Sequence, residues 1–255
     1  MVRGSDRVPV ELATPAFVLR TRPYGESDRI VTLITARHGK LTGIAKGARN
    51  SRRRFAGTLE PFVHIHAVFQ HRPGSDLVFL HRCELLDVLP GFRRDLDRFT
   101  AGSYVLELTD RLVLGPESGA EVYGLVRDAL GLLDGGAAPE PLLRAVVMHL
   151  LALSGWGPGL DRCRDCETAV APTGTMFLGP DRAGLLCRAC VPAEQPVRPV
   201  SAAAVHELAR LASAPLASAV ATPALAEAAL VAEQLVDAIA TGPVRSRAFL
   251  GLAPR

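Results

Sequence analysis

The stretch PFVHIHAVFQ, residues Pro61–Gln70, alternates apolar and polar side chains. A period of two places successive residues on opposite faces and is typical of a half-buried β-strand. One face then carries Val63, Ile65, Ala67 and Phe69, and the other carries His64 and His66. Such a strand has two edges that need partners, and the neighbouring sequence supplies them.

Four more short segments of strand type surround this one, with turn residues between them. They are Ala16–Arg22, Arg29–Ala36, Leu41–Gly47 and Asp76–Leu85, and the turns read PYGESD, RHGK and RPGS. Five strands within about 70 residues favour a small closed barrel, because closure removes the exposed edges. We predict a five-stranded barrel of the OB type, with an SH3-like barrel as the second choice.

The pattern changes to a helical period after Leu89. One stripe of the first helix is formed by Phe92, Leu96, Phe99, Leu106 and Val113. Gly115-Pro116 ends this helix, and Ser118 with Glu121 forms a capping box for the next, which runs to about Leu133. Three later stretches are also expected to be helical: Pro139–Ser154, Val200–Ser213 and Pro223–Thr241.

The predicted fold class is therefore α+β with several domains. An N-terminal barrel, expected to bind DNA on the charge argument below, would occupy residues 1–87. A helical domain would comprise residues 88–156 and 197–255. Residues 157–196 are rich in Gly, Pro and Cys and would form an insertion in the helical domain.

Charge is unevenly distributed along the chain. The 29 Lys and Arg against 26 Asp and Glu give a net charge of +3, yet residues 29–59 alone hold +8, which leaves −5 for the remainder. A concentrated basic face attracts polyanions, of which nucleic acid and anionic membrane are the two broad classes. The N-terminus lacks a secretory apolar segment and no stretch is long enough to span a bilayer, so we expect a cytoplasmic protein.

The basic stretch centres on GIAKGARNSRRRF, residues Gly43–Phe55. Its small residues would let a phosphate backbone approach, and a groove of this kind follows that backbone without reading bases. The candidate DNA-binding residues, which could share one face of the barrel, are Arg37, Lys40, Lys46, Arg49, Arg52, Arg53 and Arg54.

Other interpretations of the basic stretch stay open. A lone arginine triplet is commonly a solvated loop between strands. Membrane binding is disfavoured, because no basic amphipathic helix accompanies the charges. Aromatic side chains for stacking bases are sparse, since only Phe55, Phe62 and Phe69 are available and some of them must be core. The stretch therefore predicts binding that tolerates any base sequence.

Two C-x-x-C pairs, Cys163 with Cys166 and Cys187 with Cys190, are separated by 20 residues. Two such knuckles complete a tetrahedral shell of four thiolates with no open position, which predicts one structural Zn²⁺ in a zinc ribbon. Disulfides would conflict with a reducing compartment, and a redox pair or a catalytic zinc lacks its expected context. The fifth cysteine, Cys83, is most simply a core residue.

His64 and His66 share one strand face and could also bind a metal ion. A half-exposed polar face explains this pair equally well.

Taken together, these residues resemble the RecO family of recombination mediators in bacterial DNA repair. The resemblance is densest in Glu26–Thr35, His38–Lys40, Ala45–Arg49, Arg54–Phe62, the four paired cysteines with Gly155-Trp156 before them, and Val244–Leu250. It covers nearly the whole chain in order and length, although the helical middle matches by pattern more than by residue. Glu167 stands where the family often has Gly, and Arg182-Ala183-Gly184 stands where a Gly pair is common.

The resemblance implies an OB barrel, a helical domain and a zinc ribbon. It also implies binding to single- and double-stranded DNA, annealing of complementary strands, and work with RecR to load the RecA recombinase onto strands covered by single-strand-binding protein. The C-terminal tail of that protein would bind the helical domain, and the chain would associate with the nucleoid.

No catalysis is expected, and the sequence lacks the G-x-x-x-x-G-K-[ST] motif of nucleotide hydrolysis. The alternative is an adaptor whose helical domain docks partner proteins, with DNA contact secondary. A metal-dependent enzyme would require a metal ion with an open coordination position.

Overall fold

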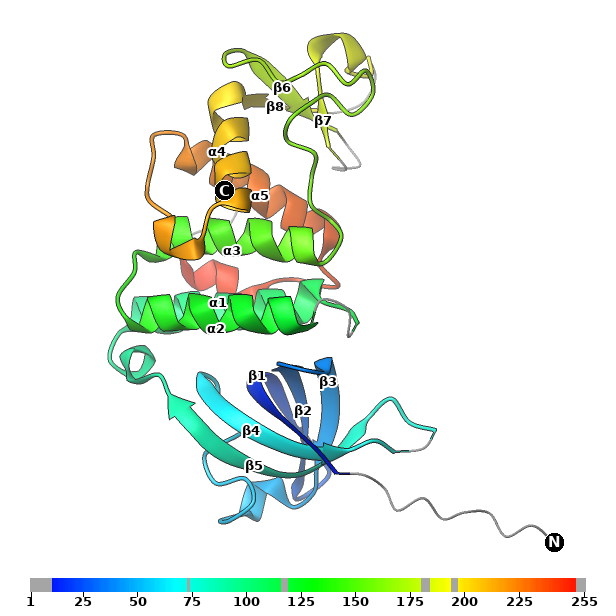
Figure 1. Ribbon diagram of the computed structural model, residues 1–255, viewed down its shortest axis with the longest axis vertical. Helices are drawn as coiled ribbons and strands as arrows, with labels where there is room; N and C mark the ends of the chain where they lie inside the picture. Colours follow the sequence, from blue (N-terminus) through cyan, green and yellow to red (C-terminus); the bar gives the residue numbers. More distant parts are fainter. Residues whose placement is uncertain (1–10, 73, 116–118, 180–183, 194–196, 251–255) are drawn as a thin grey trace, which may run out of the picture. The chain divides into compact units, whose positions relative to one another are not determined.

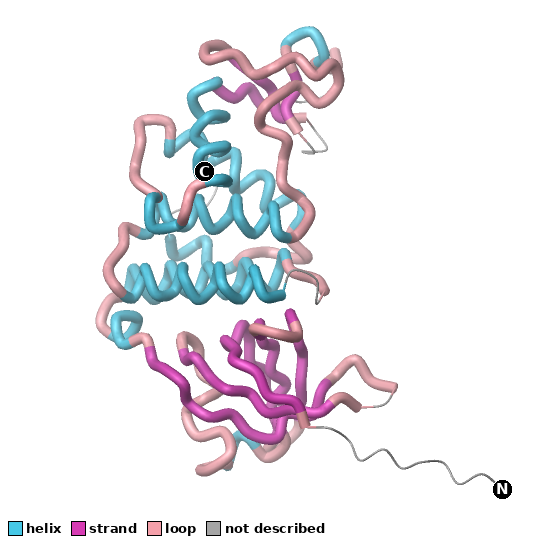
Figure 2. The backbone as a smooth tube through the Cα atoms, viewed as in Figure 1, coloured by secondary structure: helices cyan, strands magenta, loops and turns pink. Residues whose placement is uncertain are grey.

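The computed structural model describes residues 11–72, 74–115, 119–179, 184–193 and 197–250. The chain forms two compact units, one of residues 1–89 with 115–124 and the other of residues 90–114 with 125–255. Strands make up most of the first unit and helices most of the second (Figure 1, Figure 2). Within the described ranges, no helix is both long enough and apolar enough to cross a membrane.

The first unit contains a closed barrel. Its strands are β1 Leu12–Tyr24, β2 Asp28–Thr35, β3 Gly39–Ala45, β4 Val63–Gln70 and β5 Val78–Val88. The order around the barrel is β1-β2-β3-β5-β4, and β1 pairs with both β2 and β4. This five-stranded barrel confirms the OB-type architecture that the sequence predicts.

The barrel closes where β3 runs parallel to β5, with Gly43 opposite Val78. A Cβ atom on Gly43 would lie 2.8 Å from Cγ2 of Val78 and 3.2 Å from its carbonyl oxygen. Only glycine therefore lets the two strands approach this closely. β1 pairs with β2 on one side and with β4 on the other, and a bulge between Val18 and Arg20 bends it in its pairing with β2.

The interior of the barrel is filled by one face of each strand. Ile65, Ala67 and Phe69 of β4 are fully buried there, as their alternation with the histidines predicts. Phe55 and Leu59 join them from the connection between β3 and β4, so part of that connection belongs to the core.

The second unit is organised around a central helix. The helices are α1 Leu96–Leu112, α2 Gly119–Asp134, α3 Pro139–Leu153, α4 Ala202–Ser213 and α5 Leu225–Ile239, and the first six residues of α2 belong to the first unit. α3 packs against α1, α4 and α5, which is the central position expected of an almost uninterrupted apolar sequence.

A small sheet and several short 3₁₀ helices complete the fold. The sheet has the order β7-β6-β8, from Leu185–Leu186, Thr175–Leu178 and Arg198–Ser201. The 3₁₀ helices are η1 Ala48–Asn50, η2 Pro90–Arg93, η3 Arg188–Cys190, η4 Leu216–Ser218 and η5 Arg245–Leu250.

The first helix differs from its expected form. It begins at Leu96 because the carboxylate of Asp95 accepts the N–H groups of Asp97 and Arg98. Leu96 and Phe99 are 77% and 45% exposed, so these two do not belong to the buried stripe. Ser118, the predicted cap of α2, lies outside the described residues.

A group of charged and polar side chains is buried in the second unit. Arg144 of α3 is fully buried and pairs with Glu233 of α5, whose Oε1 also accepts the hydroxyl of Tyr104 at 2.9 Å. Arg247 of η5 reaches the other oxygen of Glu233 at 2.6 Å. Burial raises the pKa of Tyr104, with the charge of Glu233 adding to the effect, so the phenol stays protonated. We call these four residues the buried ionic group.

Candidate nucleic-acid interface and metal centre

The connection between β3 and β4, residues 46–62, carries most of the predicted cations. It leaves the barrel where Arg29, near the start of β2, lies opposite Ala45 at the end of β3. Lys46, Arg49 and the triplet Arg52–Arg54 are all exposed on it. We call residues 46–62 the basic connection, and these five residues are its cations.

The basic connection is fixed to the barrel by contacts that do not use its charges. Gly47 adopts a left-handed backbone, and its N–H donates to Oδ1 of Asp28 at 2.8 Å. The N–H of Arg49 donates to the carbonyl of Ser27, and the carbonyl of Arg54 accepts the N–H of Cys83 at 2.8 Å. The backbone is therefore held in place while the side chains remain at the surface.

The cations of the basic connection face almost no opposite charge. Arg54 donates to the carbonyl of Lys46 at 2.8 Å, and Arg49 donates to the carbonyl of Glu26 at 2.9 Å. In the part of the chain that the structure describes, none of the five forms an ion pair with a carboxylate. Their charges thus remain available to an anionic partner.

The structure separates the other two predicted cations from this group. Arg37 lies in the turn between β2 and β3, and Lys40 pairs with Ile34 just after it, at the far end of that hairpin. Six residues of extended chain separate Lys40 from Lys46, roughly 20 Å. The seven candidates therefore form two groups rather than one continuous patch.

The aromatic residues considered for stacking are not available. Phe55, Phe62 and Phe69 are all buried, at 4%, 6% and 0% exposure. The structure instead exposes Tyr24 at the end of β1, directly opposite Asp28, with 54% of its surface accessible. It also places the ring of Phe79 5.7 Å from the ammonium of Lys46. Tyr24 belongs to the turn sequence PYGESD, and because turns lie at the surface, this position could have indicated an exposed ring from the sequence.

The four paired cysteines converge on one point. Their sulfur atoms all lie within 4.8 Å of one another, and the Sγ atoms of Cys166 and Cys187 are 3.6 Å apart. A metal–sulfur distance of about 2.3 Å places the sulfurs of a tetrahedral site about 3.8 Å apart, so this geometry can hold a metal ion. Among the residues described, no other group of three or more His, Cys, Asp or Glu is placed to hold a metal ion, and the cysteine group contains neither His64 nor His66.

Local hydrogen bonds build the first knuckle. The N–H of Glu167 donates to the carbonyl of Cys163 at 2.9 Å, and the N–H of Cys163 donates to the carbonyl of Thr168 at 2.8 Å. This turn gives Glu167 a left-handed backbone with φ of 58°. The conformation explains why glycine would suit the position, because a side chain there is strained. Glu167 leaves the knuckle closed, and all four cysteines remain in place.

The thiols of this site differ strongly in acidity. The hydroxyl and backbone N–H of Thr168, with neighbouring thiols, lower the pKa of Cys166 to about 6. Hydrogen bonds with Cys166 and Cys187 raise the pKa of Cys190 to about 12. Four thiolates this close repel one another, and a bound cation would replace their protons and remove the repulsion. Cys83 takes no part, because it is buried in the barrel, where desolvation raises its pKa to about 12.

Comparison with known proteins gives consistent matches along the chain. The family model Recombination protein O N terminal matches residues 10–89, and Recombination protein O C terminal matches residues 93–247. The protein named DNA repair protein RecO from Anaeromyxobacter sp. (strain Fw109-5) is 43% identical over 209 residues, 82% of each chain. Those of the same name from Syntrophus aciditrophicus (strain SB) and Syntrophotalea carbinolica (strain DSM 2380 / NBRC 103641 / GraBd1) are 37% identical over 76% of each chain and 35% identical over 93% of each chain.

Proposed function

The chain belongs to the RecO family of DNA repair proteins, and from that premise we propose that it is a recombination mediator that binds single- and double-stranded DNA through the basic connection of its barrel. In this role it anneals complementary strands and, together with RecR, helps to load RecA onto strands covered by single-strand-binding protein. It acts by binding rather than by catalysis.

The observation that carries this proposal is that five exposed cations on a fixed backbone have no carboxylate partner among the described residues. The phosphates of a DNA strand would supply the missing negative charges, and the strand would release its condensed counterions on binding. Neutralising one strand lowers the repulsion that a complementary strand meets on approach, while the bases of the bound strand stay free to pair. Charge neutralisation therefore accounts for both binding and annealing.

The four cysteines fit one structural Zn²⁺ in this proposal. Four sulfur ligands fill a tetrahedral shell, so no position remains for water or substrate. The ion would hold the knuckles and the β7-β6-β8 sheet in one arrangement. The C-terminal tail of single-strand-binding protein would bind the helical unit. A titration of the full-length protein with an acidic peptide that ends in an aromatic residue tests this contact separately.

The decisive experiment is a salt titration of single-stranded DNA binding. The variant Arg52→Ala/Arg53→Ala/Arg54→Ala removes three phosphate partners, so the slope of log K against log salt should fall by about 2, from a contribution of roughly 0.7 per contact. Binding should weaken similarly for unrelated base sequences, and annealing should slow in parallel.

A matched control removes the same charge elsewhere. Arg82, Arg127 and Arg162 are exposed, and each is already paired with a carboxylate. Their triple replacement by alanine should leave the salt slope unchanged. An unchanged slope in the Arg52–Arg54 variant would show that the triplet is a solvated loop and would overturn the proposed interface.

A further inference from the structure

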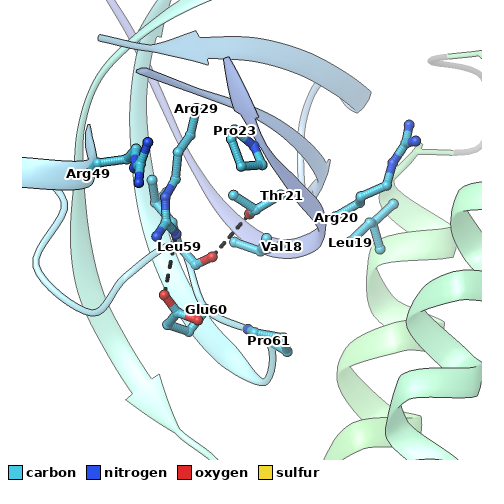
Figure 3. A pocket seen from close by; sticks show the side chains of 10 residues that line it. All are labelled: Val18, Leu19, Arg20, Thr21, Pro23, Arg29, Arg49, Leu59, Glu60 and Pro61. Atoms are coloured by element: carbon cyan, nitrogen blue, oxygen red, sulfur yellow. Dashed lines mark hydrogen bonds and ion pairs between the residues drawn. The ribbon is translucent and has the colours of Figure 1, made fainter. Parts of the chain in front are cut away.

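A pocket of about 400 Å³ lies in the barrel unit next to the basic connection (Figure 3). It is bounded by the second half of β1, by Arg29 of β2, by Arg49 of η1 and by the end of the basic connection. Its lining residues are Val18, Leu19, Arg20, Thr21, Pro23, Arg29, Arg49, Leu59, Glu60 and Pro61. We call it the Arg29–Arg49 pocket.

One wall of the pocket is apolar and fixed. The hydroxyl of Thr21 donates to the carbonyl of Leu59 at 3.1 Å, which ties the connection to β1 (Figure 3). Leu59 is 3% exposed and anchored in the barrel core. Pro23 and Pro61 add two rigid rings to the lining. This wall therefore exists before any ligand arrives.

The charged side chains of the pocket favour an anion. Three arginines, Arg20, Arg29 and Arg49, line the pocket together with one carboxylate, that of Glu60, and Arg20 points away from Glu60 (Figure 3). The guanidinium of Arg29 lies 3.4 Å from Glu60, whose side chain is 58% exposed, so this ion pair is weak and a ligand can replace it. Arg49 spends one N–H on the carbonyl of Glu26 and has further donors in its fixed fork.

We propose that the Arg29–Arg49 pocket receives a single unstacked nucleotide of a bound DNA strand. The base lies against the exposed rings of Pro23 and Pro61, and the phosphate lies at Arg29 and Arg49. A lone phosphate would leave the apolar wall in contact with water, whereas a nucleotide covers it, and pockets for small ligands begin at roughly 300 Å³. A single strand can supply such a base at low cost, while a duplex must first unpair it.

The pocket extends the proposed function, on which it rests, by adding a fixed point. Electrostatic contacts alone let a strand slide along the basic connection. One inserted nucleotide would stop that sliding and leave the neighbouring bases exposed for pairing. The pocket also gives the protein a means of distinguishing single strands from duplex.

The experiment measures binding of deoxynucleoside monophosphates to the intact protein by ligand-observed NMR, with deoxyribose 5-phosphate and inorganic phosphate as separate probes. The monophosphates should bind about tenfold more tightly than either probe, because the base contributes its contact with the apolar wall. Equal binding of all probes would reveal an anion site only and would overturn the nucleotide assignment.

Two pocket variants should act in opposite directions. Arg29→Ala should weaken monophosphate binding about tenfold by removing a charge-assisted contact. Glu60→Gln should strengthen it about threefold, because the repelling carboxylate disappears and Arg29 is released. Weaker binding in Glu60→Gln would indicate a purely structural pair and contradict the proposal. Arg82→Ala, an exposed change outside the pocket, should have no effect, and thermal unfolding of each variant checks that it folds.

The same samples are titrated with a single-stranded oligonucleotide. Strand binding without any monophosphate binding would overturn the pocket and leave the basic connection standing. If monophosphates bind but replacing Arg52–Arg54 leaves strand affinity unchanged, the pocket stands and the proposed interface at the basic connection is overturned.

Discussion

Arginine serves opposite purposes in the two units of this protein. In the second unit, Arg144 and Arg247 are buried and share the carboxylate of Glu233. In the barrel, Arg52, Arg53 and Arg54 are exposed and have no carboxylate partner within the described ranges. The first kind of charge stabilises the fold, and the second is left for another molecule. Charge count alone cannot separate them, but burial and pairing can.

The largest expected effect comes from removing the proposed metal ion, which tests whether the cysteine site of the second unit contributes to DNA binding by the barrel. Cys187→Ser/Cys190→Ser should abolish metal binding, a loss on the order of 10 kcal/mol for a structural site. Amide hydrogen exchange should show lost protection near β6 and β7, while strand affinity changes by less than about twofold. Metal content is measured on the same sample. A fall in affinity as large as that of the arginine triplet would place the cysteine ribbon in the DNA interface.

The next effect sharpens the contrast between buried and exposed pairs. Glu233→Gln leaves Arg144 buried without a compensating charge, whereas Arg247 keeps its ion pair with Asp237 at 2.6 Å. Unfolding in urea should therefore show a loss of about 3–5 kcal/mol, most of it from Arg144. The same change in the barrel, Glu60→Gln, breaks only an exposed pair and should cost less than about 1 kcal/mol. Similar losses in both variants would remove the distinction between the two units.

The third prediction concerns a carboxylate of the second unit whose contribution to stability should depend on pH. The hydroxyl of Ser201, at 2.6 Å, and its backbone N–H, at 2.8 Å, hold the pKa of Glu227 below its ordinary value. A depressed pKa means that the ionised form stabilises the fold above the ordinary pKa, and that this stability is lost as pH falls through the folded value. Glu227→Gln should therefore cost about 2 kcal/mol at pH 7, and this cost should shrink as pH falls below the ordinary carboxyl range and the wild-type side chain becomes protonated. A pH-independent difference in urea unfolding would contradict this origin.

The smallest effect distinguishes the two groups of cations in the barrel. Arg37→Ala/Lys40→Ala should weaken single-strand binding by about threefold, less than the triplet variant, because these residues lie at the far end of the β2–β3 hairpin. Fluorescence anisotropy with one oligonucleotide across a salt series measures both variants. Equal effects would mean that one strand contacts both ends of the hairpin.

Local patterns predicted the parts of the structure that local geometry determines. The period-two alternation of Pro61–Gln70 placed Ile65 and Phe69 in the core, and the spacing of Cys163 and Cys166 brought their sulfurs together. In each case, the residues that matter are separated by no more than four positions. Covalent geometry then leaves few arrangements.

Contacts between segments that are distant in the chain could not be predicted from local sequence patterns. Arg144 interrupts an apolar helix, and its partner Glu233 lies 89 positions away, so nothing local identifies the pair. The burial of Phe55 likewise depends on how the β3–β4 connection folds back onto the barrel. The separation of Arg37 from Lys46 was accessible, however, because the turn RHGK already places them at opposite ends of a strand.

The close approach of β3 and β5 at Gly43 predicts the behaviour of mutant alleles that change this residue. A Cβ atom at that position would lie 2.8 Å from Cγ2 of Val78, so β3 and β5 would have to shift at the closure and the barrel would be destabilised. A strain in which this codon is altered should therefore be sensitive to DNA damage because the polypeptide is degraded, although every cation of the proposed DNA interface is intact. Such an allele would resemble a binding defect in a screen, and an immunoblot would show that the protein itself is missing.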